Sequence, residues 1–227
     1  MPTDWWEQWN LNPALLLALA AAVPIWRRYG PADPACRQPA LLALALVAIL
    51  YVSPLCALSS ALFIARVVHH VLLATLLAPL LVAALQIRRA PGSLALWTAI
   101  QALTFWAWHA PPLYAAALSN DGVFWLMQLS ITATATLWWA KLLRSEAGSA
   151  VLSLLATMVQ MGLLGAILTF AGRAFYAPHW LTTQIWGLSP MEDQQIAGII
   201  MWAPASAIYL LTALSILYRR LAPEQAR

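Results

Sequence analysis

Long apolar stretches, separated by short breaks rich in polar residues and proline, dominate the chain. The stretches are about 20 residues long, which is the length that a helix rising 1.5 Å per residue needs to cross ~30 Å of hydrocarbon. The pattern predicts an all-α, polytopic transmembrane bundle, with residues 1–227 forming a single transmembrane helical domain. The seven predicted helices cover approximately residues 11–27, 40–58, 67–87, 93–110, 122–143, 149–171 and 190–218.

The start of the last helix carries a recognisable capping sequence. Ser189-Pro190-Met191-Glu192 places Ser at the N-cap, Pro at the first helical position and Glu at the third. This arrangement is a capping box, in which the Ser and Glu side chains satisfy each other's backbone N–H groups. The following Asp193 therefore lies in the first turn of this helix.

Proline and glycine inside the apolar runs predict local features of the helices. Pro79 and Pro204 lie within predicted helices, so we expect kinks there, with the freed carbonyls satisfied by neighbouring helices. Gly162 and Gly165 lie about one turn apart, and small residues at this spacing favour close helix packing.

Composition agrees with a membrane protein. The chain is 63% hydrophobic and 9% charged, whereas a soluble domain is about 25% charged. Such a sequence lacks the polar surface to coat a water-soluble core, so its surrounding medium is the lipid bilayer. The net charge of +4 is spread over short loops and gives no reason to expect a nucleic-acid partner.

The distribution of basic residues predicts the orientation. If the seven predicted helices alternate in direction, only Arg66 and Arg173 fall on one side of the membrane. Because positive charge favours the cytoplasm, we expect a periplasmic N-terminus and a cytoplasmic C-terminus in a multi-pass protein of a bacterial inner membrane. The remaining basic residues are Arg27, Arg28, Arg37, Arg88, Arg89, Lys141, Arg144, Arg219, Arg220 and Arg227.

Ionisable residues inside a membrane are costly and are therefore functional candidates. We expect His69 and His70 in the first turn of the third helix, His109 at the end of the fourth, and Asp193 at the start of the seventh. These residues and His179, in the loop before the seventh helix, all fall near the predicted periplasmic face. A transporter usually holds its substrate near the midplane, so the pattern favours a role at the outer surface. No nucleophile–base arrangement stands out, which indicates a non-enzymatic protein.

Histidine, methionine, aspartate and cysteine together form the ligand set of a copper site. Imidazole suits copper, and thioether or thiolate sulfur selects Cu(I). The main candidate ligands are His70, His109 and Asp193. Secondary candidates, at similar depth, are His69, Met127, Met191 and Cys56.

Each candidate also has a purely structural interpretation. His70 and His109 could be hydrogen-bonded packing residues, and His69 is expected to point to a different helix face from His70. His179, in a loop with several aromatic residues, is expected at the membrane interface. Asp193 could serve only as a carboxylate at the positive end of a helix dipole, or as a partner for Arg66.

Three segments resemble the polytopic CtaG family of cytochrome c oxidase assembly factors. The resemblance covers about residues 50–218 and is most specific in the third segment. The segments are RVVHHVLLATLLAPLLVAAL from Arg66, WHAPPLYAAALSN from Trp108, and the pair LGAILTFAGRAFYAP and WGLSPMEDQQIAGIIMW between Leu164 and Trp202.

The resemblance implies a protein needed to assemble a haem–copper oxidase. It would help deliver or insert copper at the periplasmic face, with oxidase subunits and a periplasmic copper chaperone as partners. His70, His109 and Asp193 would be the polar set retained from the family, and copper, as Cu(I), the bound metal. The chain departs from the family pattern at Arg66, Phe124 and Gln128, where histidines are often found.

Three alternatives remain open at this stage. The first is a metal-free scaffold for oxidase assembly, which the missing histidines favour. The second is a haem-binding membrane protein, for which His70 and His109 form the only reasonable ligand pair. The third is a small-solute transporter, whose helix kinks would lie at Pro79 and Pro204.

Overall fold

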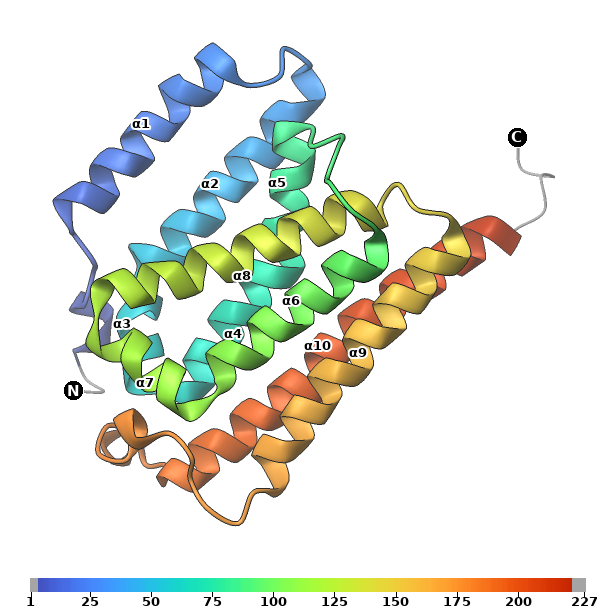
Figure 1. Ribbon diagram of the computed structural model, residues 1–227. Coiled ribbons are helices and arrows are strands. Elements are labelled where there is room, and N and C mark those ends of the chain that lie inside the picture. Colours follow the sequence, from blue (N-terminus) through green and yellow to red (C-terminus); the bar gives the residue numbers. More distant parts are fainter. Residues whose placement is uncertain (1–3, 222–227) are drawn as a thin grey trace.

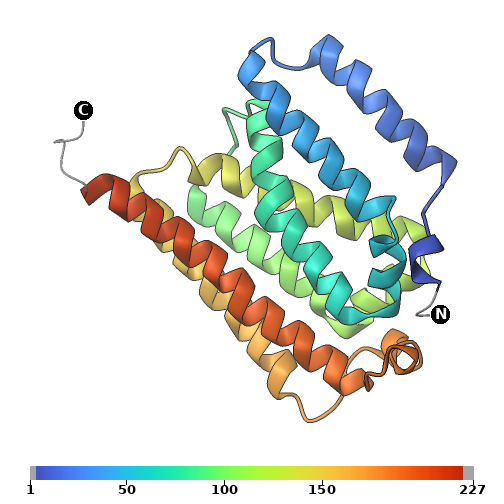
Figure 2. The ribbon, with the colours of Figure 1, turned by 180° about the vertical axis from the view of Figure 1, so that it is seen from behind.

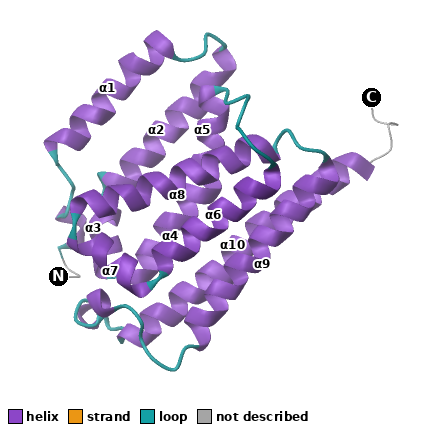
Figure 3. Cartoon of the chain, viewed as in Figure 1, coloured by secondary structure: helices purple, strands orange, loops and turns teal. Residues whose placement is uncertain are grey.

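A computed structural model describes residues 4–221, and every regular element in this range is helical (Figure 3). The predicted all-α class is therefore confirmed for the described part of the chain. The α-helices are α1 Pro13–Tyr29, α2 Arg37–Tyr51, α3 Leu55–Ala61, α4 Phe63–Leu72, α5 Ala78–Leu85, α6 Leu94–His109, α7 Pro111–Ser119, α8 Asp121–Leu142, α9 Ala147–Phe170 and α10 Pro190–Leu221.

Each predicted range overlaps a helix, but the structure adds the short helices α3 and α7. Helices α4 and α5 form one continuous helix through a π-helical turn between them. Four helical segments are long and apolar enough to cross a membrane, as expected of a membrane protein. The number of crossings and the orientation of the termini remain predictions. The four segments are Pro34–Tyr51, Phe63–Leu85, Ala147–Phe170 and Pro190–Leu221.

The second and third predicted helices have the wrong boundaries. The predicted helix 40–58 ends at Tyr51, because Pro54 cannot donate the backbone hydrogen bond that would continue it. The next long helix begins at Phe63 rather than 67. As a result, Arg66 is not in an outer loop but in the first turn of α4, with 0% of its surface exposed.

The expected disturbance at Pro79 takes the form of a π-helical turn, Leu73–Leu77, just before the proline. Pro79 has no N–H to donate, so the carbonyl of Ala74 needs another partner. The indole N–H of Trp139, on α8, donates to this oxygen at 2.8 Å. A neighbouring helix thus satisfies the freed carbonyl, as the sequence predicted.

The helices form two groups that meet along α4 (Figures 1 and 2). Helices α2 and α8 pack against the α4–α5 helix, α6 packs against α8, and α1 lies along the edge of this group (Figure 1). Helices α9 and α10 form a long hairpin, and α10 packs against α4.

Two glycines allow α9 and α10 to approach closely. A Cβ atom on Gly165 would lie 2.7 Å from the carbonyl oxygen of Gly198, and one on Gly198 would lie 2.6 Å from the carbonyl oxygen of Gly165. In contrast, a Cβ atom on Gly162 would come no closer than 3.4 Å to the Trp202 side chain. Gly165 therefore has the packing role expected from the sequence, and Gly198 is its partner.

Substitution of Gly198 by alanine should separate the hairpin. Because the clash is with backbone, it cannot be relieved by a side-chain rotation, and we expect a loss of about 1–3 kcal/mol of stability. Thermal unfolding of the purified protein in mild detergent measures this loss. The control Gly162→Ala should stay close to wild type; equal unfolding midpoints for the two variants would contradict the assigned contact.

Candidate functional site

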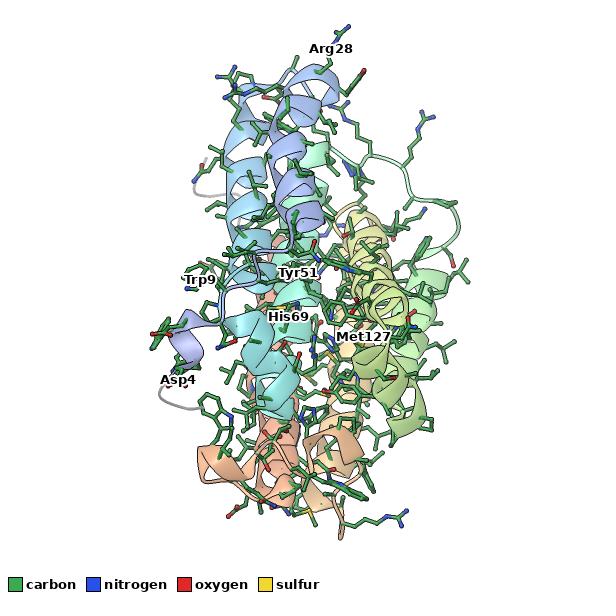
Figure 4. The ribbon with its side chains drawn as sticks, turned by 90° about the vertical axis from the view of Figure 1, so that its left-hand side faces the viewer. Asp4, Trp9, Arg28, Tyr51, His69 and Met127 are labelled. Carbon is green, nitrogen blue, oxygen red and sulfur yellow. The ribbon has the colours of Figure 1, made fainter. Side chains whose placement is uncertain are left out.

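Polar side chains gather inside the bundle near the end where α4 and α10 begin and α6 ends. Figure 4 shows Tyr51, His69 and Met127 within the bundle, while Arg28 lies at its opposite end. The imidazoles of α4 lie about 10 Å from the start of that helix, at 1.5 Å per residue. The two imidazoles of α4 therefore lie below the surface at this end of the bundle.

Asp193 holds the first turn of α4. Its carboxylate oxygens accept hydrogen bonds from the backbone N–H groups of Phe63, at 2.7 Å, and Ile64, at 3.0 Å. The first N–H groups of a helix have no partner within it and carry partial positive charge, so a buried carboxylate there is doubly favourable. We therefore assign Asp193 a positioning role at the start of α4; the metal ligation expected from the sequence stays a prediction.

The capping box predicted for α10 is present. The Ser189 backbone N–H donates to the Glu192 carboxylate at 2.8 Å, and the Glu192 N–H donates to Ser189 Oγ at 3.2 Å. This cap fixes where α10 begins, and so directs Asp193, one residue further along, into the bundle.

Gln194 ties the preceding loop to α10. Its side-chain oxygen accepts the Phe175 N–H at 2.6 Å, and its amide donates to the carbonyl oxygens of Leu168 and Arg173 at 3.2 and 3.3 Å. Asp193 and Gln194 together join α4, the end of α9 and the loop to one turn of α10. No local sequence pattern around Gln194 predicted this role.

His179 lies in that loop and is buried inside the protein, with 1% of its surface exposed; its position at the membrane interface stays a prediction. Its Nδ1 lies 3.2 Å from the Ala61 carbonyl oxygen and its Nε2 lies 2.7 Å from the Tyr114 hydroxyl. Since a carbonyl only accepts, Nδ1 donates and Nε2 accepts. Burial lowers the pKa of His179 to about 4, which keeps the ring neutral. Both nitrogens are engaged, which leaves neither free for a ligand.

His70 and His109 face each other across α4 and α6. Their rings are fully buried or nearly so, with centroids 5.5 Å apart and planes at 83°. His109 Nδ1 lies 2.7 Å from the Phe105 carbonyl oxygen and therefore carries the proton. The lone pair is then on Nε2, which has no hydrogen-bond partner, and neither nitrogen of His70 has one.

His69 also points into the bundle, contrary to the expectation that only one of the two adjacent histidines would be central. Its ring lies 6.2 Å from that of His70 and 5.0 Å, edge-on, from that of Tyr51. The Tyr51 hydroxyl in turn donates to the Gln128 side-chain oxygen at 3.4 Å. Both nitrogens of His69 lack partners. Three helices thus contribute to this side of the buried polar region.

The secondary sulfur candidates differ in burial. Met127 is fully buried, whereas Met191 and Cys56 are partly exposed. Among residues 4–221, no three His, Cys, Asp or Glu side chains are grouped so that they could hold a metal ion. The structure therefore brings His70 and His109 together but does not add Asp193 to them.

Arg66 lies one turn before His70 on α4. Its Nε donates to the Ser59 carbonyl oxygen at 3.0 Å and its Nη2 to Ser60 Oγ at 3.3 Å. The guanidinium carbon lies 5.1 Å from the centre of the Phe124 ring, a cation–π contact. Two positions where the family resemblance favours histidine, 66 and 124, thus hold residues that contact each other.

Replacing Asp193 with asparagine should loosen α4. Asparagine offers one acceptor oxygen, and its amide group would face a backbone N–H, so we expect a loss of about 1–3 kcal/mol. The readout is the unfolding midpoint, with hydrogen exchange at the start of α4 as a local probe. The matched control is Glu146→Gln, because Glu146 is an exposed carboxylate before α9 that makes no side-chain cap hydrogen bond. An unfolding midpoint that is equal for Asp193→Asn and Glu146→Gln would contradict the assigned role of Asp193.

Comparison with known proteins identifies the family of this chain. Residues 92–222, more than half of the chain, match the model of the cytochrome c oxidase caa3 assembly factor family, Caa3_CtaG. Searches of curated proteins and of solved structures gave no match. The matched range contains His109 and Asp193, and it ends with α10. The chain belongs to the Caa3_CtaG family of cytochrome c oxidase assembly factors.

Proposed function

We propose that this oxidase assembly factor carries Cu(I) as cargo between His70 and His109, at the periplasmic face of the inner membrane, for insertion into the oxidase. The observation that supports the proposal is the adjacent pair of buried imidazoles, in which His109 Nε2 and both nitrogens of His70 have no hydrogen-bond partner. Buried polar atoms are nearly always satisfied, so three orphaned ring nitrogens on two neighbouring rings favour a bound ligand.

The protonation of His109 suits it to bind a metal. A hydrogen bond from Nδ1 to a backbone carbonyl commonly fixes the orientation and tautomer of a metal-binding histidine. Here the Phe105 carbonyl oxygen does so and leaves the Nε2 lone pair free. Cu(I) accepts few ligands and prefers soft or imidazole donors, so two histidines form a suitable donor set.

The surroundings favour a transient rather than a tight site. The guanidinium of Arg66 lies one turn from His70 and repels a bound cation, and the absence of a carboxylate ligand leaves the copper charge uncompensated. A site of this kind releases its cargo readily. Oxidase subunits would be the recipients, and a periplasmic copper chaperone the donor.

Arg66 also supports a second candidate, a metal-free scaffold for oxidase assembly. In that case the buried histidines are structural, and the partner-binding surface is the end of the bundle near Asp193. This candidate differs from the first in predicting that the purified protein binds no copper and still retains the oxidase subunits.

Copper binding should depend on the facing pair. We expect the purified protein in mild detergent to bind stoichiometric Cu(I) in competition with a Cu(I) chelator. The double variant His70→Ala/His109→Ala should lose this binding, or weaken it by roughly tenfold or more. His179→Gln is the matched control, because both nitrogens of that buried histidine already have partners, and it should bind as wild type does.

Wild-type protein that binds no Cu(I), while it still co-purifies with oxidase subunits, would overturn copper transport in favour of the scaffold. Equal loss in the His179→Gln control would mean that the effect comes from the fold rather than from ligation. A Soret band in the absorption spectrum of the purified protein would instead support the haem-binding alternative.

A further inference from the structure

A cavity of about 690 Å³ lies beside the histidines, between the segment that leads into α1, the ends of α2 and α3, and the start of α8. One part of its wall is polar, and the rest is formed by apolar side chains of α1, α2 and α8. The polar residues that matter for its chemistry are Asn10, Asn12, Ser60, Arg66 and Asp121.

Arg66 provides the charge of this cavity. The two residues that flank its guanidinium, Ser60 and Phe124, also line the cavity, so the guanidinium forms the wall behind them. Its guanidinium donates to the Ser59 carbonyl and the Ser60 hydroxyl, and it also interacts with the buried Tyr114 hydroxyl; all three groups are neutral. The third nitrogen, Nη1, is buried and has no hydrogen-bond partner.

A buried guanidinium whose partners are all neutral lacks a compensating negative charge. Arginine cannot lose its proton, and a buried charge is normally paired with an opposite charge. The planar fork of donors matches two oxygens of a phosphate or carboxylate, and such charge-assisted pairs are strong away from water. The unsatisfied Nη1 therefore favours a bound oxyanion, and the adjacent cavity has room for one.

We propose that this cavity binds a phosphate-type oxyanion on Arg66. A phospholipid headgroup fits best, because the same cavity offers apolar walls along which an acyl chain can lie, including Leu15, Leu19 and Val47. Within α1, Leu15 is the only buried residue, so this helix covers the cavity loosely and leaves a lateral path for lipid. Neither His70 nor His109 lines this cavity, so the site is separate from the histidine pair.

Asp121 lies in the cavity wall but is exposed. Its carboxylate opposes the binding of an anion, and water screens it more than it screens Arg66. Removal of the Asp121 charge should therefore strengthen the binding of an anionic headgroup, whereas removal of the Arg66 charge should weaken it.

The test uses the full chain in mild detergent, with its thermal unfolding followed during titration with dioleoylphosphatidylglycerol, dioleoylphosphatidylcholine or inorganic phosphate. For wild type we expect phosphatidylglycerol to raise the unfolding midpoint saturably, by about 5 °C. Phosphatidylcholine, which has no net charge, should have a smaller effect. Arg66→Met should abolish the rise, and Asp121→Asn should shift saturation to lower lipid concentration.

Two further variants make the result specific. Arg173→Gln removes an exposed arginine from the loop before α10 and should respond as wild type does. Ala18→Trp keeps Arg66 but fills the cavity from the face of α1 that lines it, and should also abolish the rise; it replaces Arg66→Met if that variant does not fold. Stabilisation by phosphate alone would identify a small soluble anion as the ligand, and stabilisation by phosphatidylglycerol alone would identify lipid. No shift with either, or a full shift in Arg66→Met or Ala18→Trp, would overturn the proposal.

Discussion

The buried polar region depends on how the first turn of α4 is held. Two backbone N–H groups at the start of this helix have no partner in their own chain segment, and Asp193, 130 positions away in sequence from Phe63, supplies both acceptors. The capping box of α10 sets the position of Asp193, and Gln194 extends the same turn to the preceding loop. A single turn of α10 thereby fixes the start of the helix that carries Arg66, His69 and His70.

This arrangement places a guanidinium cation beside the two imidazoles that are proposed to bind copper. His70 faces His109 with free nitrogens, and Arg66 lies one turn away with an unsatisfied one. A cation held by the histidines is repelled by Arg66, and this repulsion is strong where water is excluded. An oxyanion bound to Arg66 would reduce this repulsion. Copper and anion binding would then strengthen each other by the same factor, because coupling between two sites is reciprocal.

The sequence predicted the helices well and their boundaries poorly. Long apolar runs identify helices through local composition, and the capping box and the partner for the Pro79 break follow from rules that act within a few residues. The start of α4 at Phe63 could not be predicted in this way, because its cap comes from Asp193, in a distant part of the chain. For the same reason Arg66 was expected in a loop. The burial of His69 and His179 could not be predicted, because helix-face and loop patterns do not show which distant side chains cover them. The pairing of His70 and His109 could be predicted, because both are polar residues at similar depth in the membrane. The tautomer of His109 could not be predicted, because it depends on the hydrogen bond to the Phe105 carbonyl.

The role proposed for His70 and His109 is copper insertion into the oxidase. It can be tested by the copper content and activity of the caa3-type oxidase isolated from cells that lack this gene and carry either the wild-type copy or the His70→Ala/His109→Ala copy. We expect the wild-type copy to restore both quantities, whereas the variant, present in the membrane at equal amount, should yield oxidase subunits deficient in copper and activity. Fully metallated, active oxidase in the variant cells would show that the two histidines are not needed for copper insertion.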